Sequence, residues 1–190
     1  MNRTGNYAAF YVNDGTFKEG GLGANLAKDF CHYNMLRAWK GKDPTFPFVD
    51  SHGKTYNVRD GSDWEKTLKP RLRERLRASK NMILFLSGHT KNSVAVREEI
   101  TYAASIGLPI IVVYPDFKSR EAMYNGNTPK KTVADLMAKL SSLAAAANEV
   151  PVVHIPMDKA LIRAYLNNKL YMVNTKCKAG NYACLNTVSA

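Results

Sequence analysis

Two short, uninterrupted apolar runs on either side of a helical segment limit the folds open to this chain. The runs, MILFL at residues 82–86 and PIIVVY at residues 109–114, are typical of strands covered on both faces. The segment between them, residues 93–106, repeats its apolar residues with the period of a helix and is followed by Gly107. A buried strand, a helix and a second buried strand predict a βαβ unit with parallel strands.

The same alternation continues along most of the chain. Further strands are predicted at residues 7–12, 46–49 and 151–155. Further helices are predicted at residues 24–39, from residue 63 with an irregular start at Pro70, and at residues 132–148 and 157–166. We therefore expect an α/β fold of flavodoxin-like order, with a central five-stranded, mostly parallel sheet and helices on both faces. One domain would span residues 1–166, and residues 167–190 would form a C-terminal extension.

Composition excludes several classes of protein. Hydrophobic residues make up 45% and charged residues 23% of the 190, as in globular rather than disordered chains. The longest apolar runs are far shorter than the roughly 20 residues of a membrane span. The first ten residues lack the apolar core of a secretion signal, and the 3 cysteines do not form a disulfide framework. We therefore expect a cytoplasmic protein with no membrane partner.

The net charge of +11 favours an anionic partner without identifying it. The densest basic cluster lies between Lys69 and Lys80, on a segment whose leucines at 68, 72 and 76 form one apolar stripe of a helix. The basic side chains would then form a solvated outer face or contact an acidic partner surface. No aromatic residues alternate with them for base stacking, so nucleic-acid binding is not expected.

Two adjacent acids in the helix at residues 93–106 occupy different faces. On a helical wheel, Val96, Ile100 and Ala103 form the buried stripe. Glu98 lies about 160° from this stripe and belongs in water, whereas Glu99 lies about 70–80° from it, at its edge. Because helical side chains lean toward the N-terminus, Glu99 should point to the loop after the third strand, where the ligand crevice of such a sheet is expected.

A partly buried carboxylate at that place suits one kind of chemistry. It can stabilise an oxocarbenium-like transition state, as in cleavage of an N-glycosidic bond, where the leaving group departs unaided. The alternative from spacing alone is that Glu99 is a hydrogen-bonded residue at the margin of an amphipathic helix.

Several segments resemble the TIR-like domain of the Thoeris antiphage proteins. The most specific piece is residues 95–100 followed by residues 107–113, which is similar to the family pattern W-V-x-x-E-I, a short helix, and then G-x-x-I-I-x-[VI]. Further matches lie at the ends of the predicted strands, in residues 9–14, 48–51 and 78–87. The resemblance covers residues 6–116 well. Ala95 stands where the family has a tryptophan, and Tyr11 and Val12 stand where some active TIR enzymes have arginines.

This resemblance implies a flavodoxin-like TIR domain that consumes NAD as a glycohydrolase or ADP-ribosyl cyclase. The family's catalytic glutamate aligns with Glu99, which the helical wheel selects independently. Substrate contacts would come from Phe10, Tyr11 and Asp14 in the first loop and from Asp50 after the second strand. NAD is then the substrate, and neither a metal nor a further cofactor is expected. The product would be an ADP-ribose-derived signal, cyclic ADP-ribose among the candidates, that activates a separate effector after phage infection.

Two other functions stay open. Many TIR domains are non-enzymatic adaptors that act through self-association, and the basic helix around residues 68–77 would then be the interface. Self-association is also expected of an enzyme of this family. The other alternative is a nucleotide-binding or nucleic-acid-binding protein of the same fold, which the positive charge suggests. Residues 21–26 supply only a partial G-x-G-x-x-G fingerprint for it.

Overall fold

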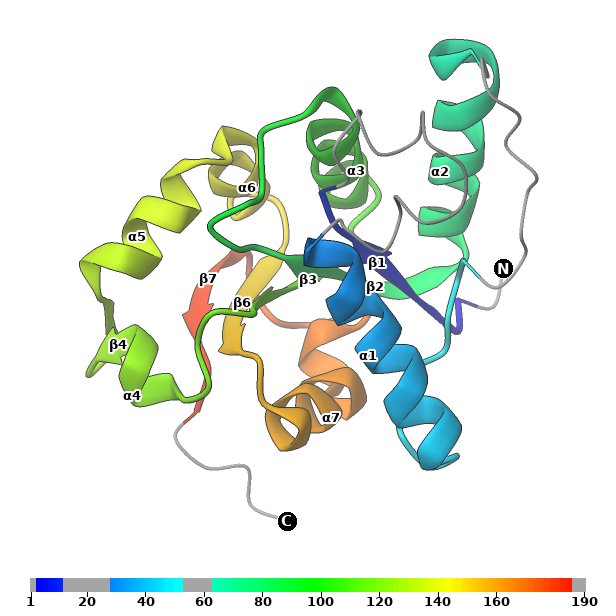
Figure 1. Ribbon diagram of the computed structural model, residues 1–190. Coiled ribbons are helices and arrows are strands. Elements are labelled where there is room, and N and C mark those ends of the chain that lie inside the picture. The colour runs from blue at the N-terminus through cyan, green and yellow to red at the C-terminus, as the bar shows by residue number, and fades with distance from the viewer. Residues whose placement is uncertain (1–2, 12–27, 53–62, 186–190) are drawn as a thin grey trace.

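A fully parallel sheet of five strands forms the centre of the molecule (Figure 1). The computed structural model describes residues 3–11, 28–52 and 63–185 of the chain. The strand order is β1-β2-β3-β6-β7, and every neighbouring pair is parallel. The strands are β1 (Gly5–Ala9), β2 (Ser79–Phe85), β3 (Ile110–Tyr114), β6 (Pro151–Pro156) and β7 (Gly180–Ala183). This architecture confirms the predicted α/β class.

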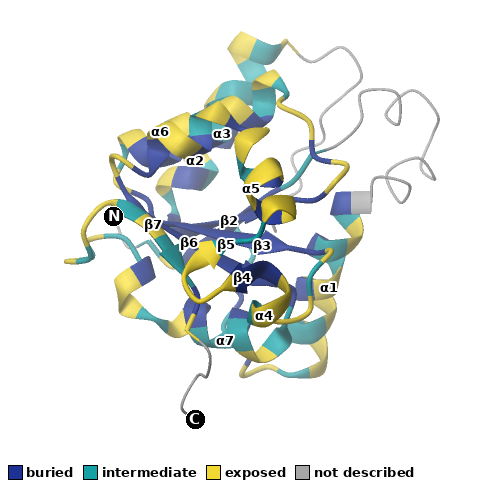
Figure 2. Cartoon of the chain, turned by 90° about the vertical axis from the view of Figure 1, so that its left-hand side faces the viewer, coloured by how far each residue is buried: buried dark blue, intermediate teal, exposed yellow. Residues whose placement is uncertain are grey.

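Helices cover both faces of this sheet, so that the molecule has three layers (Figure 2). On one face pack α2 (Lys69–Arg77), α3 (Val94–Ser105), α5 (Lys131–Ala138) and α6 (Ser141–Ala146). On the other face pack α1 (Lys28–Lys42) and α7 (Lys159–Asn167). The short helix α4 (Arg120–Met123) leads into a hairpin of β4 (Tyr124–Asn125) and β5 (Thr128–Pro129). None of the described helices is long and apolar enough to cross a membrane.

The helix layers on both faces explain the uninterrupted apolar runs in β2 and β3. In β2, Met82 and Leu84 belong to the core under α2 and α3, whereas Ile83 and Phe85 belong to the core over α1 and α7. Strand β3 divides its side chains in the same way. Because successive residues of a strand point to opposite faces, a strand covered on both sides has to be apolar throughout.

The predicted second strand, residues 46–49, is reduced to a single bridge between Asn6 and Asp50. The side chain of Asp50 accepts a hydrogen bond from the amide of His52, which forms a turn directly after the bridge. The imidazole Nε2 of His52 then lies 2.9 Å from the carbonyl oxygen of Ala8. A side chain thus contacts the backbone acceptor that the next pair of a longer strand would use.

The fifth strand of the sheet comes instead from β7, within the segment expected to be a C-terminal extension. It pairs with β6 from Pro151↔Gly180 to His154↔Ala183. Buried His154 links three strands, because Nδ1 lies 2.8 Å from the hydroxyl of Tyr114 on β3 and Nε2 lies 2.9 Å from Oδ1 of Asn181 on β7. The boundary between domain and extension at residue 166 stays a prediction, but the segment after it completes the sheet.

One predicted helix is divided in two, and another has the irregular start that was predicted for it. The segment at residues 132–148 divides into α5 and α6 because the backbone of buried Leu140 leaves the helical conformation (φ −119°, ψ 88°). The helix expected from residue 63 starts, as predicted, irregularly: a π-helical turn, Trp64–Leu68, precedes α2, and Pro70 occupies the first turn of α2.

Candidate active site

Glu99 lies on α3 and contacts the edge strand β1. Helix α3 buries Val96, Ile100 and Ala103 against the sheet, which is the stripe that the helical wheel predicted. The hydroxyl of Tyr7 donates a hydrogen bond of 2.6 Å to Oε1 of Glu99. The wheel directed Glu99 to the loop after the third strand, whereas the hydrogen bond found is to β1, which pairs with that strand.

The second carboxyl oxygen of Glu99 has no such partner. Oε2 is buried and accepts no hydrogen bond from any residue that the structure describes. Burial raises the pKa of Glu99 to about 7, against the opposing effects of the Tyr7 hydrogen bond and the positive charge of Arg75. Near neutral pH this carboxyl therefore exists in both protonation states, with one oxygen left for a further contact.

His52 and Arg75 form a second pair beside this carboxyl. The carbonyl of Ala8 can only accept a hydrogen bond, so Nε2 of His52 carries the hydrogen, and Nδ1 accepts from Nη1 of Arg75 at 3.3 Å. Burial, and then the charge of Arg75, lower the pKa of His52 to about 4. The imidazole is therefore neutral at pH 7, and its ring lies 4.7 Å from that of Tyr7 between centroids.

Asp50 already uses both of its carboxylate oxygens within the protein. Oδ2 accepts a 2.6 Å hydrogen bond from the hydroxyl of Tyr33 on α1, and Oδ1 accepts from the amide of His52. Nε of Arg37 lies 3.8 Å from Oδ2. Burial, followed by the hydrogen bond to Asp50, raises the pKa of Tyr33. In this arrangement Asp50 holds an aromatic side chain in place.

Phe10 and Tyr11 follow β1 at the carboxyl end of the strand. The ring of Phe10 stacks on Tyr33 with centroids 5.3 Å apart and lies 5.5 Å from Phe30, so an aromatic cluster joins the first loop to α1. Nζ of Lys91, from the loop between β2 and α3, lies 5.9 Å from the ring centroid of Tyr11. The loops after β1 and β2 are thus side by side, as expected for the crevice of a parallel sheet.

The remaining sequence-predicted positions cannot be placed. Asp14 and the partial glycine fingerprint at residues 21–26 lie outside the described residues. In the parts of the chain that are described, no three His, Cys, Asp or Glu side chains come together as a metal site.

The sequence from residue 7 to residue 120 matches the family model described as Thoeris protein ThsB, TIR-like domain. This range covers more than half of the chain and begins at the residue whose hydroxyl contacts Glu99. The chain belongs to this family. The match confirms the resemblance drawn from the sequence and identifies the chain as a TIR domain of Thoeris antiphage defence.

All the residues of the site described so far fall inside the range matched by the Thoeris TIR-like family. Sequence reasoning selected Glu99 but missed Tyr7, His52 and Arg75, which contact it or one another. Tyr7 lies within an apolar strand, and Arg75 is one of several basic residues on α2. Neither has a local pattern that distinguishes it from its neighbours.

The other acid of α3 is placed differently from its prediction. Glu98 was expected in water, but its side chain is only 19% exposed and pairs with α2, the neighbouring helix of this TIR-like domain. Nε and Nη2 of Arg73 lie 2.7 and 2.6 Å from Oε1, and Nζ of Lys69 lies 3.8 Å from Oε2. The wheel describes one helix in isolation, whereas the packing of α2 beside α3 brings opposite charges to the outer face of both.

A buried acid on α1, Asp29, holds the loop after β2. Its Oδ1 accepts from the hydroxyl of Ser87 at 2.7 Å and its Oδ2 from that of Thr90 at 3.0 Å. The amide of His89 bonds in turn to the oxygen of Ser87. This clamp was not predicted, because an acid in the first turn of a helix is ordinary in sequence.

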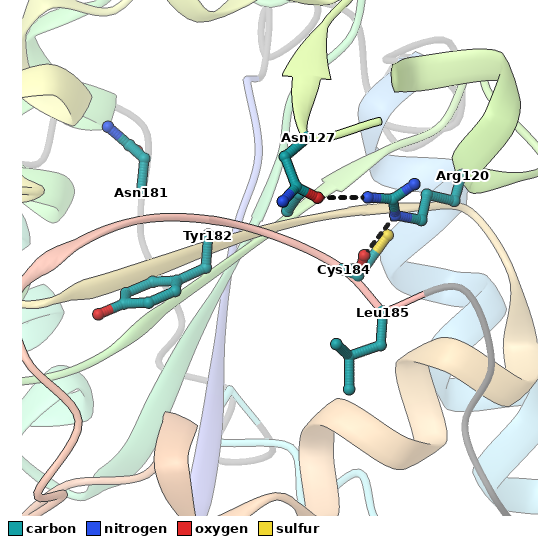
Figure 3. A pocket seen from close by; sticks show the side chains of 7 residues that line it. Arg120, Asn127, Asn181, Tyr182, Cys184 and Leu185 are labelled. Carbon is teal, nitrogen blue, oxygen red and sulfur yellow. Dashed lines mark hydrogen bonds between the residues drawn. The ribbon is translucent and has the colours of Figure 1, made fainter. Parts of the chain in front are cut away.

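A groove of about 710 Å³ lies away from Glu99, at the opposite edge of the sheet (Figure 3). Arg120 and Asn127 line one side, and residues 181–185 line the other. The guanidinium of Arg120 donates from Nε to the carbonyl of Cys184 and from Nη2 to Oδ1 of Asn127. The groove falls almost wholly outside the range matched by the Thoeris TIR-like family.

Proposed function

We propose that this TIR domain is an enzyme that cleaves the nicotinamide–ribose bond of NAD, as a glycohydrolase or ADP-ribosyl cyclase. The observation that carries the proposal is the buried carboxyl of Glu99, with Oε1 bonded to Tyr7 and Oε2 without a partner among the described residues. A buried carboxyl with an unused oxygen is costly to keep in a fold unless it contacts a ligand. Such a group suits the stabilisation of a developing sugar cation.

The reaction needs little from the protein besides this charge. The bond between C1′ of the ribose and the pyridinium nitrogen breaks, and its electron pair leaves with nicotinamide, which departs neutral. Positive charge then develops on the ribose. Ionised Glu99 would stabilise it and accept hydrogen bonds from the ribose hydroxyls through Oε2. No proton has to reach the leaving group, so the chemistry requires neither a metal nor a further cofactor.

The nucleophile decides the product. Attack by water at C1′, with loss of a proton, gives ADP-ribose, whereas attack by a nitrogen of the adenine in the same molecule gives a cyclic ADP-ribose. Either product can serve as a diffusible signal to a separate effector in antiphage defence. The partly exposed rings of Phe10 and Phe30 support this proposal, because planar rings beside the crevice offer stacking surfaces for the bases of NAD.

The test is the fate of NAD with purified protein, followed by chromatography and mass spectrometry. Wild-type protein should release nicotinamide, Glu99→Gln should not, and Glu98→Gln should retain activity because Glu98 pairs with α2 on the outer face. The assay should include concentrated protein, because we also propose that the domain self-associates, and lysate from phage-infected cells. The mass of the product separates hydrolysis from cyclisation.

The absence of turnover in every condition, with the protein folded, would contradict the enzyme. It would favour the alternative of a non-enzymatic TIR module that assembles through its surfaces. In that case defence in cells should survive Glu99→Gln.

A further inference from the structure

We propose that Tyr7 and Arg75 are positioning residues for Glu99: Tyr7 fixes which oxygen faces the substrate, and Arg75, held by His52, supplies a positive charge that favours the ionised carboxyl. This inference rests on the proposed function and assigns the control of the same site. It names residues on three separate elements, β1, α2 and the turn after Asp50, none of which the sequence singles out.

Tyr7 gives Glu99 a rigid anchor. Its side chain is only 2% exposed, and its backbone is paired with Met82 of β2. A tyrosine hydroxyl facing a carboxylate donates its hydrogen, so the 2.6 Å contact occupies Oε1 and leaves Oε2 as the oxygen available to substrate. A carboxyl held at one oxygen by a buried ring cannot turn freely about its last bond.

Arg75 is held in place by the neutral imidazole of His52, which carries no charge of its own. His52 donates through Nε2 to the carbonyl of Ala8, so only the lone pair on Nδ1 faces Nη1 of Arg75. The imidazole is also packed against the ring of Tyr7. A neutral imidazole accepts from the guanidinium and adds no second positive charge. The cation held by this imidazole is thus an arginine, a side chain that is not deprotonated in proteins, and its charge acts on Glu99.

Among the described residues, the polar and charged groups around Glu99 come from three different elements. Strand β1 contributes Tyr7, helix α2 contributes Arg75, and the turn after Asp50 contributes His52. On α3 itself, Glu98 is turned away and paired with Arg73. Both Tyr7 and Arg75 act to lower the pKa of Glu99, against the larger effect of burial. Removal of either should leave the carboxyl protonated at a pH where the wild-type carboxyl is ionised.

The first experiment is the pH dependence of kcat/KM for NAD in Arg75→Gln and Tyr7→Phe. Wild-type activity should rise with pH through about 7, as Glu99 ionises. In both variants the rise should move upward by about one pH unit, so that activity falls about tenfold at pH 6.5 and recovers by pH 9. Arg75→Lys keeps the charge and should restore the wild-type profile. A loss by the same factor at every pH would mean that these residues only support the fold.

Matched controls remove similar groups elsewhere. Arg77→Gln deletes another arginine of α2, and Tyr165→Phe deletes a hydroxyl from the opposite face of the sheet. Neither should move the midpoint of the profile.

A second measurement does not depend on turnover. Protein labelled with ¹³C at the glutamate carboxyl carbon is titrated by NMR, and the Glu99 signal is assigned by its loss in Glu99→Gln. Its midpoint should rise in Arg75→Gln and Tyr7→Phe even if no NAD is consumed, which separates this proposal from the enzyme assignment. An unchanged midpoint in both variants, with native circular dichroism, would overturn it.

Discussion

The hydroxyl of Tyr7 and the carboxyl of Glu99 are 92 residues apart in sequence and 2.6 Å apart in the fold. This contact joins the edge strand of the sheet to the helix that carries the acid. It also places the acid where it is difficult to ionise, because the surrounding core is apolar. The protein therefore keeps at its candidate site a group that the fold alone would not favour, which is common where stability is given up for activity.

Glu99→Gln should stabilise the protein at alkaline pH. The pKa of Glu99 is raised from 4.5 to about 7 in the fold, so ionisation is easier in the unfolded chain, and stability falls as the pH rises from 4.5 to 7. A neutral glutamine avoids this penalty. Above pH 7 the variant should be more stable by up to about 3 kcal/mol, and near pH 4 it should equal the wild type. Urea unfolding at both values checks this.

The matched change at the neighbouring acid should behave in the opposite way. Glu98→Gln weakens the ion pair with Arg73, so it should cost up to about 1 kcal/mol at pH 8. Equal effects of the two substitutions would argue against a special environment for Glu99.

Acid should destabilise the fold through two buried histidines. Burial lowers the pKa of His52 and of His154 from 6.5 to about 4, so both prefer to be neutral in the fold. Their contribution to stability is complete above pH 6.5 and is lost as the pH falls toward 4. His154→Gln should therefore flatten the dependence of Tm on pH between 6.5 and 4, whatever its effect at pH 8. The exposed His89, changed to Gln, should leave this slope unaltered.

Asn81→Ala should be among the more damaging single substitutions outside the apolar core. Both Asn6 and Asn81 are fully buried; Nδ2 of Asn6 donates to Oδ1 of Asn81, and Nδ2 of Asn81 donates to the carbonyl of Tyr171. Alanine leaves a buried donor and a buried acceptor without partners, which should cost about 2–4 kcal/mol. Chemical denaturation measures the loss, with the exposed Asn148→Ala as a control that should change stability little.

Asp29→Ala should loosen the loop after β2 without unfolding the domain. The two hydroxyls of Ser87 and Thr90 lose a shared buried acceptor, and the amides of Ser87 and His89 depend on those hydroxyls. Hydrogen exchange of these two amides should speed up at least tenfold, while the amides of β2 stay protected. Exposed Asp135→Ala is the control. Unchanged exchange in the loop would mean that the clamp does not order it.

The sequence was most informative where one element decides the outcome. The runs at residues 82–86 and 109–114 predicted β2 and β3 because a strand with two covered faces has a local signature. The helical wheel placed Glu99 at the edge of the buried stripe because the period of a helix is also a local property of one segment. Glu98 was misplaced because its environment is made by α2, a different helix.

Features that depend on contacts between distant segments could not be predicted in this way. Strand β7 has four residues, GNYA, and no alternation of its own, so only its pairing with β6 defines it. The residues around Glu99 come from β1, α2 and the turn at His52, and each is unremarkable in its own segment. Helical period and apolar runs carry no information about which side chains meet.

The hydrogen bond from His52 to Ala8 has a consequence for the outline of the sheet. Asn6 faces the segment at Asp50 with its backbone groups, and Ala8, two residues later, faces the same side. On that side its carbonyl accepts a hydrogen bond from the imidazole of His52, which lies where a neighbouring backbone would have to pass. A longer strand along this edge and the His52–Arg75 pair would therefore exclude each other. On this edge of the sheet, backbone pairing at Asn6 is followed directly by the side-chain contacts of the candidate site.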